Sequence, residues 1–151
     1  MNFNLDFSIL DDNWNISLPD HKKIITNAIK KVFNELKQFE NKNYEISILL
    51  SNNQYIKKLN LEHRSIDKAT NVLSFPMIND YSMDHENILG DIIISIDKIF
   101  SESNEQNIEV YNYLSKISVH GILHLLGYDH ITDKDYYLMK QLEEKIMEKI
   151  V

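Results

Sequence analysis

Residues 120–130 read HGILHLLGYDH, and this segment decides both the local fold and the chemistry that we expect of the chain. His120 and His124 are four residues apart, so their side chains project from one face of a helix. The apolar residues around them predict that the helix is buried, and Gly127 predicts its end, because glycine adopts the left-handed conformation that follows a last helical turn. The turn at Gly127 brings His130 toward the first two imidazoles. We predict a three-histidine metal site at a helix end, with His120, His124 and His130 as ligands.

Three neutral imidazoles suit zinc and leave one corner of its tetrahedron open to water. We therefore expect one zinc ion per chain in a catalytic site. Structural zinc sites fill the fourth position, usually with a thiolate, and this chain has no cysteine. The alternative is that each histidine is a buried residue hydrogen-bonded to its own neighbour. A shared metal is favoured, because three imidazoles on one apolar segment all need partners.

The segment matches the metalloprotease pattern H-E-x-x-H-x-x-G-x-x-H except at the second position, where Gly121 replaces the glutamate. Without that carboxylate the motif has no base for the attacking water and no acid for a leaving amine. Peptide cleavage is therefore disfavoured. Phosphodiester hydrolysis fits better, because a metal ion and a nearby cation can neutralise the anionic transition state.

Arg64 is the only arginine among the 16 lysine and arginine residues of the chain. A guanidinium group is permanently charged and binds phosphate through two parallel hydrogen bonds, so Arg64 is a candidate for the nearby cation. The alternative is that Arg64 pairs with an acidic neighbour such as Asp67 at the end of a short helix. The residues alone do not decide between these two interpretations.

Several blocks of the sequence, spread over most of the chain, resemble the YbeY family of rRNA maturation factors. They are LNLEHR at residues 59–64, Asp67, TNVLSFP at residues 70–76, LGDI at residues 89–92 and the histidine segment at residues 120–130. The histidine motif is highly specific, and the order and spacing of the blocks also fit that family.

The resemblance implies a single-strand-specific, metal-dependent endoribonuclease that acts in 16S rRNA 3′-end maturation and in ribosome quality control. Its partners would be single-stranded RNA, the small ribosomal subunit and ribosome-associated proteins. The three histidines would hold zinc, and Arg64 stands at the family's arginine, which contacts RNA phosphate. We therefore take Arg64 and His120 as candidate catalytic residues, and His120, His124 and His130 as candidate metal ligands.

The chain departs from the family pattern at two positions. His63 stands where tyrosine is usual, and it is either a further imidazole facing the cleft or an exposed residue at a helix end. Asn71 stands where aspartate is usual. Asparagine keeps the shape of aspartate and loses its charge, which puts any role of that carboxylate in proton transfer or cation binding in doubt here.

The composition predicts one domain, residues 1–151, that works in the cytoplasm and not in a membrane. The sequence has 43% hydrophobic residues, no apolar stretch near twenty residues and no basic-then-apolar start. Its net charge of −7 conflicts with RNA binding, which usually needs a basic surface. A local cluster could resolve the conflict, and we expect a positive cleft formed by the metal with Lys57, Lys58, Arg64 and Lys68.

Hydrophobic periodicity predicts an α+β fold in which a mixed sheet of about four strands packs against helices. We expect strands at residues 3–9, 44–50, 72–75 and 92–94, helices at residues 19–36, 52–63, 107–126 and 132–150, and a surface loop at residues 77–87. Asn107 and Thr132 are the expected caps of the last two helices, and the final helix is expected to cover the sheet. Asp91 and Asp129 are candidate carboxylates that orient the ligand histidines.

Two rival functions remain open at this point. The chain could be a metal-dependent hydrolase of another ester or amide, or a ribosome-assembly factor that binds RNA or protein without cutting it. Metal content and the effect of Arg64→Ala on RNA cleavage distinguish them.

Overall fold

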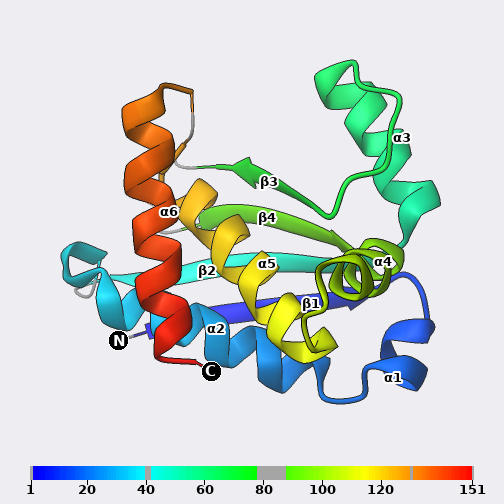
Figure 1. Ribbon diagram of the computed structural model, residues 1–151, viewed down its shortest axis with the longest axis horizontal. Coiled ribbons are helices and arrows are strands. Elements are labelled where there is room, and N and C mark those ends of the chain that lie inside the picture. The colour runs from blue at the N-terminus through cyan, green and yellow to red at the C-terminus, as the bar shows by residue number, and fades with distance from the viewer. Residues whose placement is uncertain (1, 40–41, 78–87, 130, 151) are drawn as a thin grey trace.

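A computed structural model describes residues 2–39, 42–77, 88–129 and 131–150, and shows helices packed on a four-stranded sheet (Figure 1). The strands are β1 (Asn2–Ile9), β2 (Asn43–Ser51), β3 (Val72–Pro76) and β4 (Ile88–Ser95), and the helices are α1 (Asn13–Ser17), α2 (His21–Glu35), the 3-10 turn η1 (Lys37–Phe39), α3 (Asn53–Arg64), α4 (Ile96–Gln106), α5 (Val110–Leu125) and α6 (Asp133–Glu148).

The sheet has the strand order β1-β2-β4-β3. β1, β2 and β4 are mutually parallel, whereas the edge strand β3 runs antiparallel to β4. Parallel neighbours need a helical crossover, which α2 provides between β1 and β2. The expected α+β fold with a mixed sheet of four strands is therefore confirmed.

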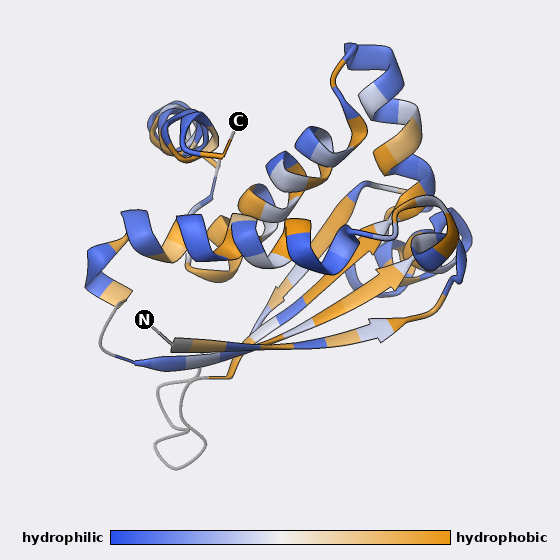
Figure 2. Cartoon of the chain, turned by 90° about the horizontal axis from the view of Figure 1, so that it is seen from below, coloured by the Kyte–Doolittle hydropathy of each residue, from blue (hydrophilic) through white to orange (hydrophobic). Residues whose placement is uncertain are grey.

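Alternation along the strands divides the buried side chains between the two faces of the sheet. Ile92 and Ile94 of β4 join the main core beneath α2 and α5, on the side where Figure 2 shows the helices gathered. Ile93 points to the other face and forms a smaller core with Leu73 and with Ile56 of α3. α3 therefore covers the β3 edge from the face opposite to α5.

Two helices were not predicted from the sequence. α1 is a five-residue helix that buries Trp14, whose indole N–H donates to the Ser51 carbonyl at 2.9 Å. α4 follows β4 directly, and Asn107 is its left-handed C-cap, with φ of 57°. The expected capping of the next helix by Asn107 is wrong, because Glu109 caps α5 by accepting from the backbone N–H groups of its first turn.

α6 begins as predicted, since the Thr132 side chain accepts from the Asp135 N–H at 3.0 Å. It packs against α5 and α2 and forms a further layer outside them (Figures 1 and 2), so the expectation that it covers the sheet is wrong. Met139 and Ile146 are its buried residues, whereas Tyr136 is 54% exposed. None of the helices in the described ranges is both long and apolar enough to cross a bilayer.

Candidate metal centre and active-site cleft

The end of α5 is fixed by the turn predicted at Gly127. The Gly127 N–H donates to the His124 carbonyl at 3.1 Å, and the Tyr128 N–H donates to the Leu123 carbonyl at 3.0 Å. This pair of bonds is the Schellman arrangement that closes a helix with a left-handed residue, and Gly127 has φ of +98°. The chain therefore turns back at Gly127, three residues after His124, as expected.

The first two candidate ligands face one another on α5. His120 Nε2 and His124 Nε2 are 3.0 Å apart, and the two rings are nearly perpendicular, at 76°. Two zinc-bound nitrogens in a tetrahedral site are about 3.3 Å apart, given a Zn–N distance of about 2.05 Å. The spacing and the chemistry of these two nitrogens therefore fit a shared divalent cation.

The third candidate ligand, His130, lies outside the described residues. Within residues 2–39, 42–77, 88–129 and 131–150 there is no cluster of three or more metal-ligating side chains. His120 and His124 thus form a two-nitrogen site in the described part of the chain, and the ligand role of His130 stays a prediction from its spacing in the motif.

Glu143 of α6 is a functional candidate that the sequence analysis missed. Its carboxylate accepts a hydrogen bond from Nδ1 of His120, and 16% of the Glu143 side chain is exposed. A proton on Nδ1 leaves the lone pair of the neutral ring on Nε2, the atom that faces His124. The sequence does contain a clue to Glu143. This acidic residue lies four positions after Met139 and three before Ile146, the two buried residues of α6, so it occupies the inward face of that helix.

Gly121, the residue at the missing glutamate position, faces the sheet. A Cβ placed there would lie 3.2 Å from Val72 Cγ2 and 3.5 Å from Ile92, so α5 approaches the sheet closely at this residue. The Gly121 carbonyl also accepts a hydrogen bond from Ser74 Oγ of β3, at 3.0 Å. A longer side chain at position 121 would enter the packed core and not the cleft, so this fold has no room for a carboxylate here.

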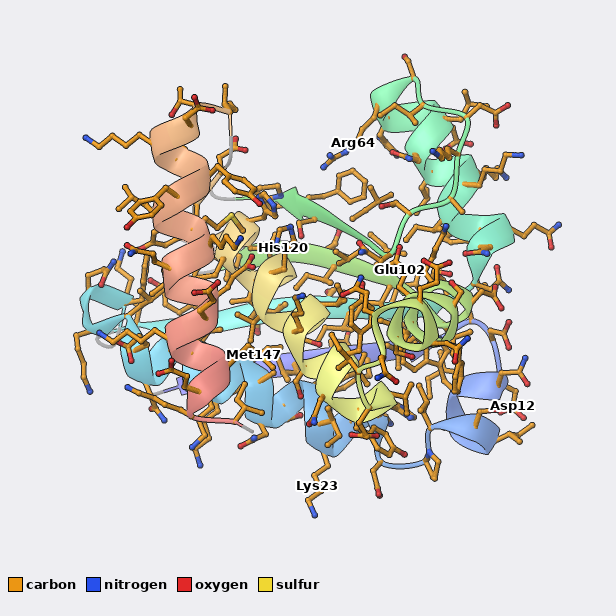
Figure 3. The ribbon with its side chains drawn as sticks, in the orientation of Figure 1. Asp12, Lys23, Arg64, Glu102, His120 and Met147 are labelled. Carbon is orange, nitrogen blue, oxygen red and sulfur yellow. The ribbon has the colours of Figure 1, made fainter. Side chains whose placement is uncertain are left out.

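Arg64 and the two histidines meet at one cavity of about 500 Å³ between α3, β3 and α5. Figure 3 shows Arg64 extending from the end of α3 over β3, on the side where His120 lies. The guanidinium donates to the Ser74 carbonyl at 3.4 Å, which uses one of its five N–H donors. The cavity lining is Arg64, Thr70, Asn71, Val72, Ser74, Pro76, His120, His124, Gly127, Tyr128 and Asp129. We call it the active-site cleft.

The expected lysine cluster does not line this cleft. Lys57 and Lys68 border a different, shallow depression beside α3, where the Asp67 carboxylate lies 3.8 Å from Lys57 Nζ. Among the described cleft residues, Arg64 is the only lysine or arginine. Asp67 therefore lies beside Lys57 and not beside Arg64. The alternative in which Arg64 forms an ion pair with Asp67 is wrong.

Three other candidate residues from the sequence, His63, Asp91 and Asp129, differ in whether they reach the cleft. His63 is exposed in the last turn of α3, with its ring 5.0 Å from that of Phe75, and it does not line the cleft. Asp91 precedes Ile92, which contacts Gly121, so it points to the face of the sheet away from the histidines. Asp129 does line the cleft.

Comparison with known proteins gives the family. The model of the family described as "Endoribonuclease YbeY" matches residues 8–151. The chain belongs to the YbeY family. A YbeY endoribonuclease from Wolbachia pipientis of Culex pipiens is 41% identical over 95% of this chain and 91% of its own length. One from Caldicellulosiruptor saccharolyticus is 44% identical over 78% of this chain and 80% of its own. The solution structure of TM1509 from Thermotoga maritima covers 97% of this chain and 89% of its own, with a TM-score of 0.63 and 26% identity.

Asn71, one of the two departures from the YbeY pattern, belongs to a partly buried hydrogen-bond network at the edge of the cleft. Its amide donates to Glu102 Oε1 at 2.9 Å, and the Tyr113 hydroxyl donates to the same oxygen at 2.5 Å. Burial, reinforced by Glu102, raises the pKa of Tyr113 above its usual range, so the phenol remains a donor. In this chain the Asn71 amide thus satisfies a carboxylate, and aspartate could not donate that bond.

Proposed function

We propose that this YbeY-family chain is a zinc-dependent endoribonuclease that hydrolyses phosphodiesters of single-stranded RNA and acts in 16S rRNA 3′-end maturation. One observation carries the proposal. A single cavity joins the facing nitrogens of His120 and His124 to the only arginine of the chain. Imidazole nitrogens are ligands for a divalent cation, and a guanidinium binds phosphate.

His120 and His124 would hold the ion together with His130. When bound, the ion supplies Lewis acidity toward water and toward a phosphoryl oxygen. The protein keeps both described ligands on the rigid helix α5, and Glu143 sets the tautomer of His120 so that its Nε2 lone pair faces the site. Preorganised ligands of this kind bind a metal without first paying the entropy of ordering.

Arg64 orients the substrate in this mechanism and balances its charge. Hydrolysis joins a water oxygen to phosphorus, breaks the ester P–O bond and passes a proton to the leaving oxygen, while negative charge grows on the phosphoryl group. A guanidinium beside the phosphate stabilises that charge more in the transition state than in the ground state. The remaining donors of Arg64 suit this, because its single contact with the Ser74 carbonyl is long, at 3.4 Å.

The acidic charge of the chain limits how RNA can bind. A net charge of −7 opposes a broad electrostatic interface, so affinity has to come from the cation, Arg64 and local contacts. This pattern agrees with an enzyme that acts on RNA presented by a larger particle. We accordingly propose the small ribosomal subunit or its associated proteins as partners, ribosome quality control as a further role, and the cytoplasm as the location.

One preparation tests the ion, the reaction and the substrate. The purified chain is analysed for metal and incubated with single-stranded and duplex RNA, with and without a chelator, beside His124→Ala as the site variant and His63→Ala as a matched exposed control. We expect zinc near one equivalent, cleavage of single strands only, and loss of both metal and cleavage in His124→Ala.

Other results identify the rival functions. Zinc with no RNA cleavage, but with hydrolysis of a carboxylic or other phosphoric ester, indicates a different hydrolase. A chain whose cellular effect survives both the chelator and His124→Ala is a binding factor in ribosome assembly and not a nuclease.

A further inference from the structure

A second concavity adjoins the active-site cleft, between α5 and α6. It has a volume of about 640 Å³ and shares His120 and Asn71 with the cleft. Its other lining residues are Ile108, Asn112, Tyr113, Lys116, Ile117, Tyr136, Met139, Lys140, Glu143, Glu144 and Met147. We call it the α5–α6 groove.

The groove has an apolar floor and a polar rim. Tyr113, Ile117 and Met139 are 2–5% exposed and form its floor, and Tyr136, which is 54% exposed, borders it. Lys116 is half-buried at the rim, and Lys140 Nζ lies 6.0 Å above the ring of Tyr136. An apolar floor with a few polar groups at its edge is typical of small-molecule sites.

The position of the groove beside His120 indicates which part of an RNA substrate it can bind. Because His120 separates the groove from the cleft, a nucleotide next to a phosphodiester at His120 and His124 meets the mouth of the groove directly. The groove carries two lysines, Lys116 and Lys140, whose charges balance those of Glu143 and Glu144, and the lysine side chains can reach a flanking phosphate from the rim. A base is apolar on its faces and hydrogen-bonds at its edge, which Asn112 and Glu144 can serve.

We propose that the α5–α6 groove binds the base of the nucleotide next to the cleaved phosphodiester of a single-stranded RNA. This inference rests on the proposed nuclease function and adds a physical reason for strand selectivity. A base inserted between two helices cannot remain paired or stacked in a duplex, so duplex RNA loses this contact.

The test combines one protein change with one RNA change. The protein variant is Lys116→Trp, which fills the groove from its rim on α5, and the control is Lys98→Trp, an equally half-exposed helical lysine on α4 outside both cavities. The RNA is a single-stranded oligonucleotide whose main cut by the wild-type chain has been mapped, with an abasic residue placed in turn at each nucleotide around the cut. Cleavage rates and binding by fluorescence anisotropy are both measured.

We expect the abasic residue at one flanking position to lower kcat/KM of the wild-type chain about tenfold, which is about 1.4 kcal/mol and lies within the roughly 1–3 kcal/mol typical for a stacked base. Lys116→Trp should lose a similar factor on intact RNA and become insensitive to that abasic residue, while Lys98→Trp behaves as wild type. The proposal is wrong if no abasic position matters, or if Lys116→Trp slows intact and abasic RNA equally, as it would if the tryptophan disturbed the cleft without displacing a base. It is also wrong if Lys116→Trp has no effect on intact RNA, as expected for a groove that receives a protein partner. If the wild-type chain does not cut the oligonucleotide, the abasic residue is placed in turn along its whole length and binding alone is measured. The same non-additive pattern in binding then means that the nuclease function fails and the groove still binds a base of single-stranded RNA.

Discussion

The carboxylate of Glu143 on α6 is hydrogen-bonded to Nδ1 of His120 on α5, so the two helices meet at the candidate metal ligand. A carboxylate behind a ligating imidazole fixes the ring and its tautomer and raises the basicity of the other nitrogen. Glu143 is therefore a positioning residue. It also makes α6, which carries no candidate ligand, part of the candidate metal centre.

Replacing Glu143 should weaken metal binding without unfolding the chain. We expect Glu143→Ala to raise the dissociation constant for zinc by about 10–100-fold, the range found for such orienting partners. Glu143→Gln should lose less, because its amide oxygen still accepts from Nδ1. Competition with a chromophoric chelator measures the affinity, and Glu148→Gln, an exposed change on the same helix, is the control. Equal affinities in Glu143→Ala and wild type would refute the positioning role.

Arg64 should matter for cleavage and little for stability. Its side chain is exposed and makes one long bond to Ser74, so Arg64→Ala should leave the melting temperature nearly unchanged. Its kcat on single-stranded RNA should fall by about 100–1,000-fold, as for loss of one donor to a transition-state oxyanion. Arg64→Lys should recover only part of the rate, because a lysine lacks the two-pronged geometry. Lys57→Ala is the matched control, and retained cleavage in Arg64→Ala would contradict the assigned role.

The regular elements could be predicted where one periodicity dominated. Alternation in β1 and β2 and the helical stripe of α5 matched their positions closely, and the Gly127 turn followed from the need for a positive φ. α4 was missed because Ile96 follows the apolar run of β4 after a single serine, Ser95, so no clear change of period marks the start of the helix. The boundary is a change of backbone conformation at Ser95, and the Ser95 side chain makes no cap bond there.

The candidate site was predictable as far as it lies in local motifs. The His120 and His124 pair follows from spacing along one helix, whereas the Glu143 contact joins residues 23 positions apart and depends on how α6 packs. The proposed lysine cluster failed for the same reason, since nearness to Arg64 in sequence says little about which side of α3 a lysine occupies. Tertiary packing, and not residue type, decides such contacts.

Gly121 should tolerate a methyl group and reject a carboxylate. In Gly121→Ala the close approach to Val72 opposes a gain in helix propensity of about 1 kcal/mol, so we expect little net change in unfolding free energy. Gly121→Glu places a charged chain between α5 and the sheet and should cost about 3 kcal/mol or more. Urea unfolding measures both. A stable Gly121→Glu chain would show that position 121 opens to the cleft, contrary to the packing.

Asn71 and Glu102 should behave as a pair. Asn71→Asp removes the donor to Glu102 and sets two carboxylates side by side, which should lower the unfolding free energy by about 1–3 kcal/mol at neutral pH. Asn71→Asp combined with Glu102→Gln restores a donor and should recover most of the loss. Denaturant unfolding of the two single variants and the double variant gives the coupling energy, and simple additivity would mean that the bond contributes nothing.

Glu35 of α2 should make stability fall in acid, because it ties α6 to α2. Its carboxylate contacts Lys149 and lies 3.0 Å from Lys145 Nζ, and the hydrogen bonds to Lys149 and Lys145 lower the pKa of Glu35 below its ordinary value of 4.5. A depressed pKa stabilises the fold above pH 4.5, and that contribution is lost as pH falls through the folded-state pKa. Glu35→Gln should therefore cost about 1 kcal/mol at pH 7 and nothing near pH 2, since these lysines are largely exposed. Urea unfolding across this range, beside exposed Glu105→Gln, checks the difference. A Glu35→Gln deficit that stayed constant with pH would mean that packing, and not charge, joins the two helices.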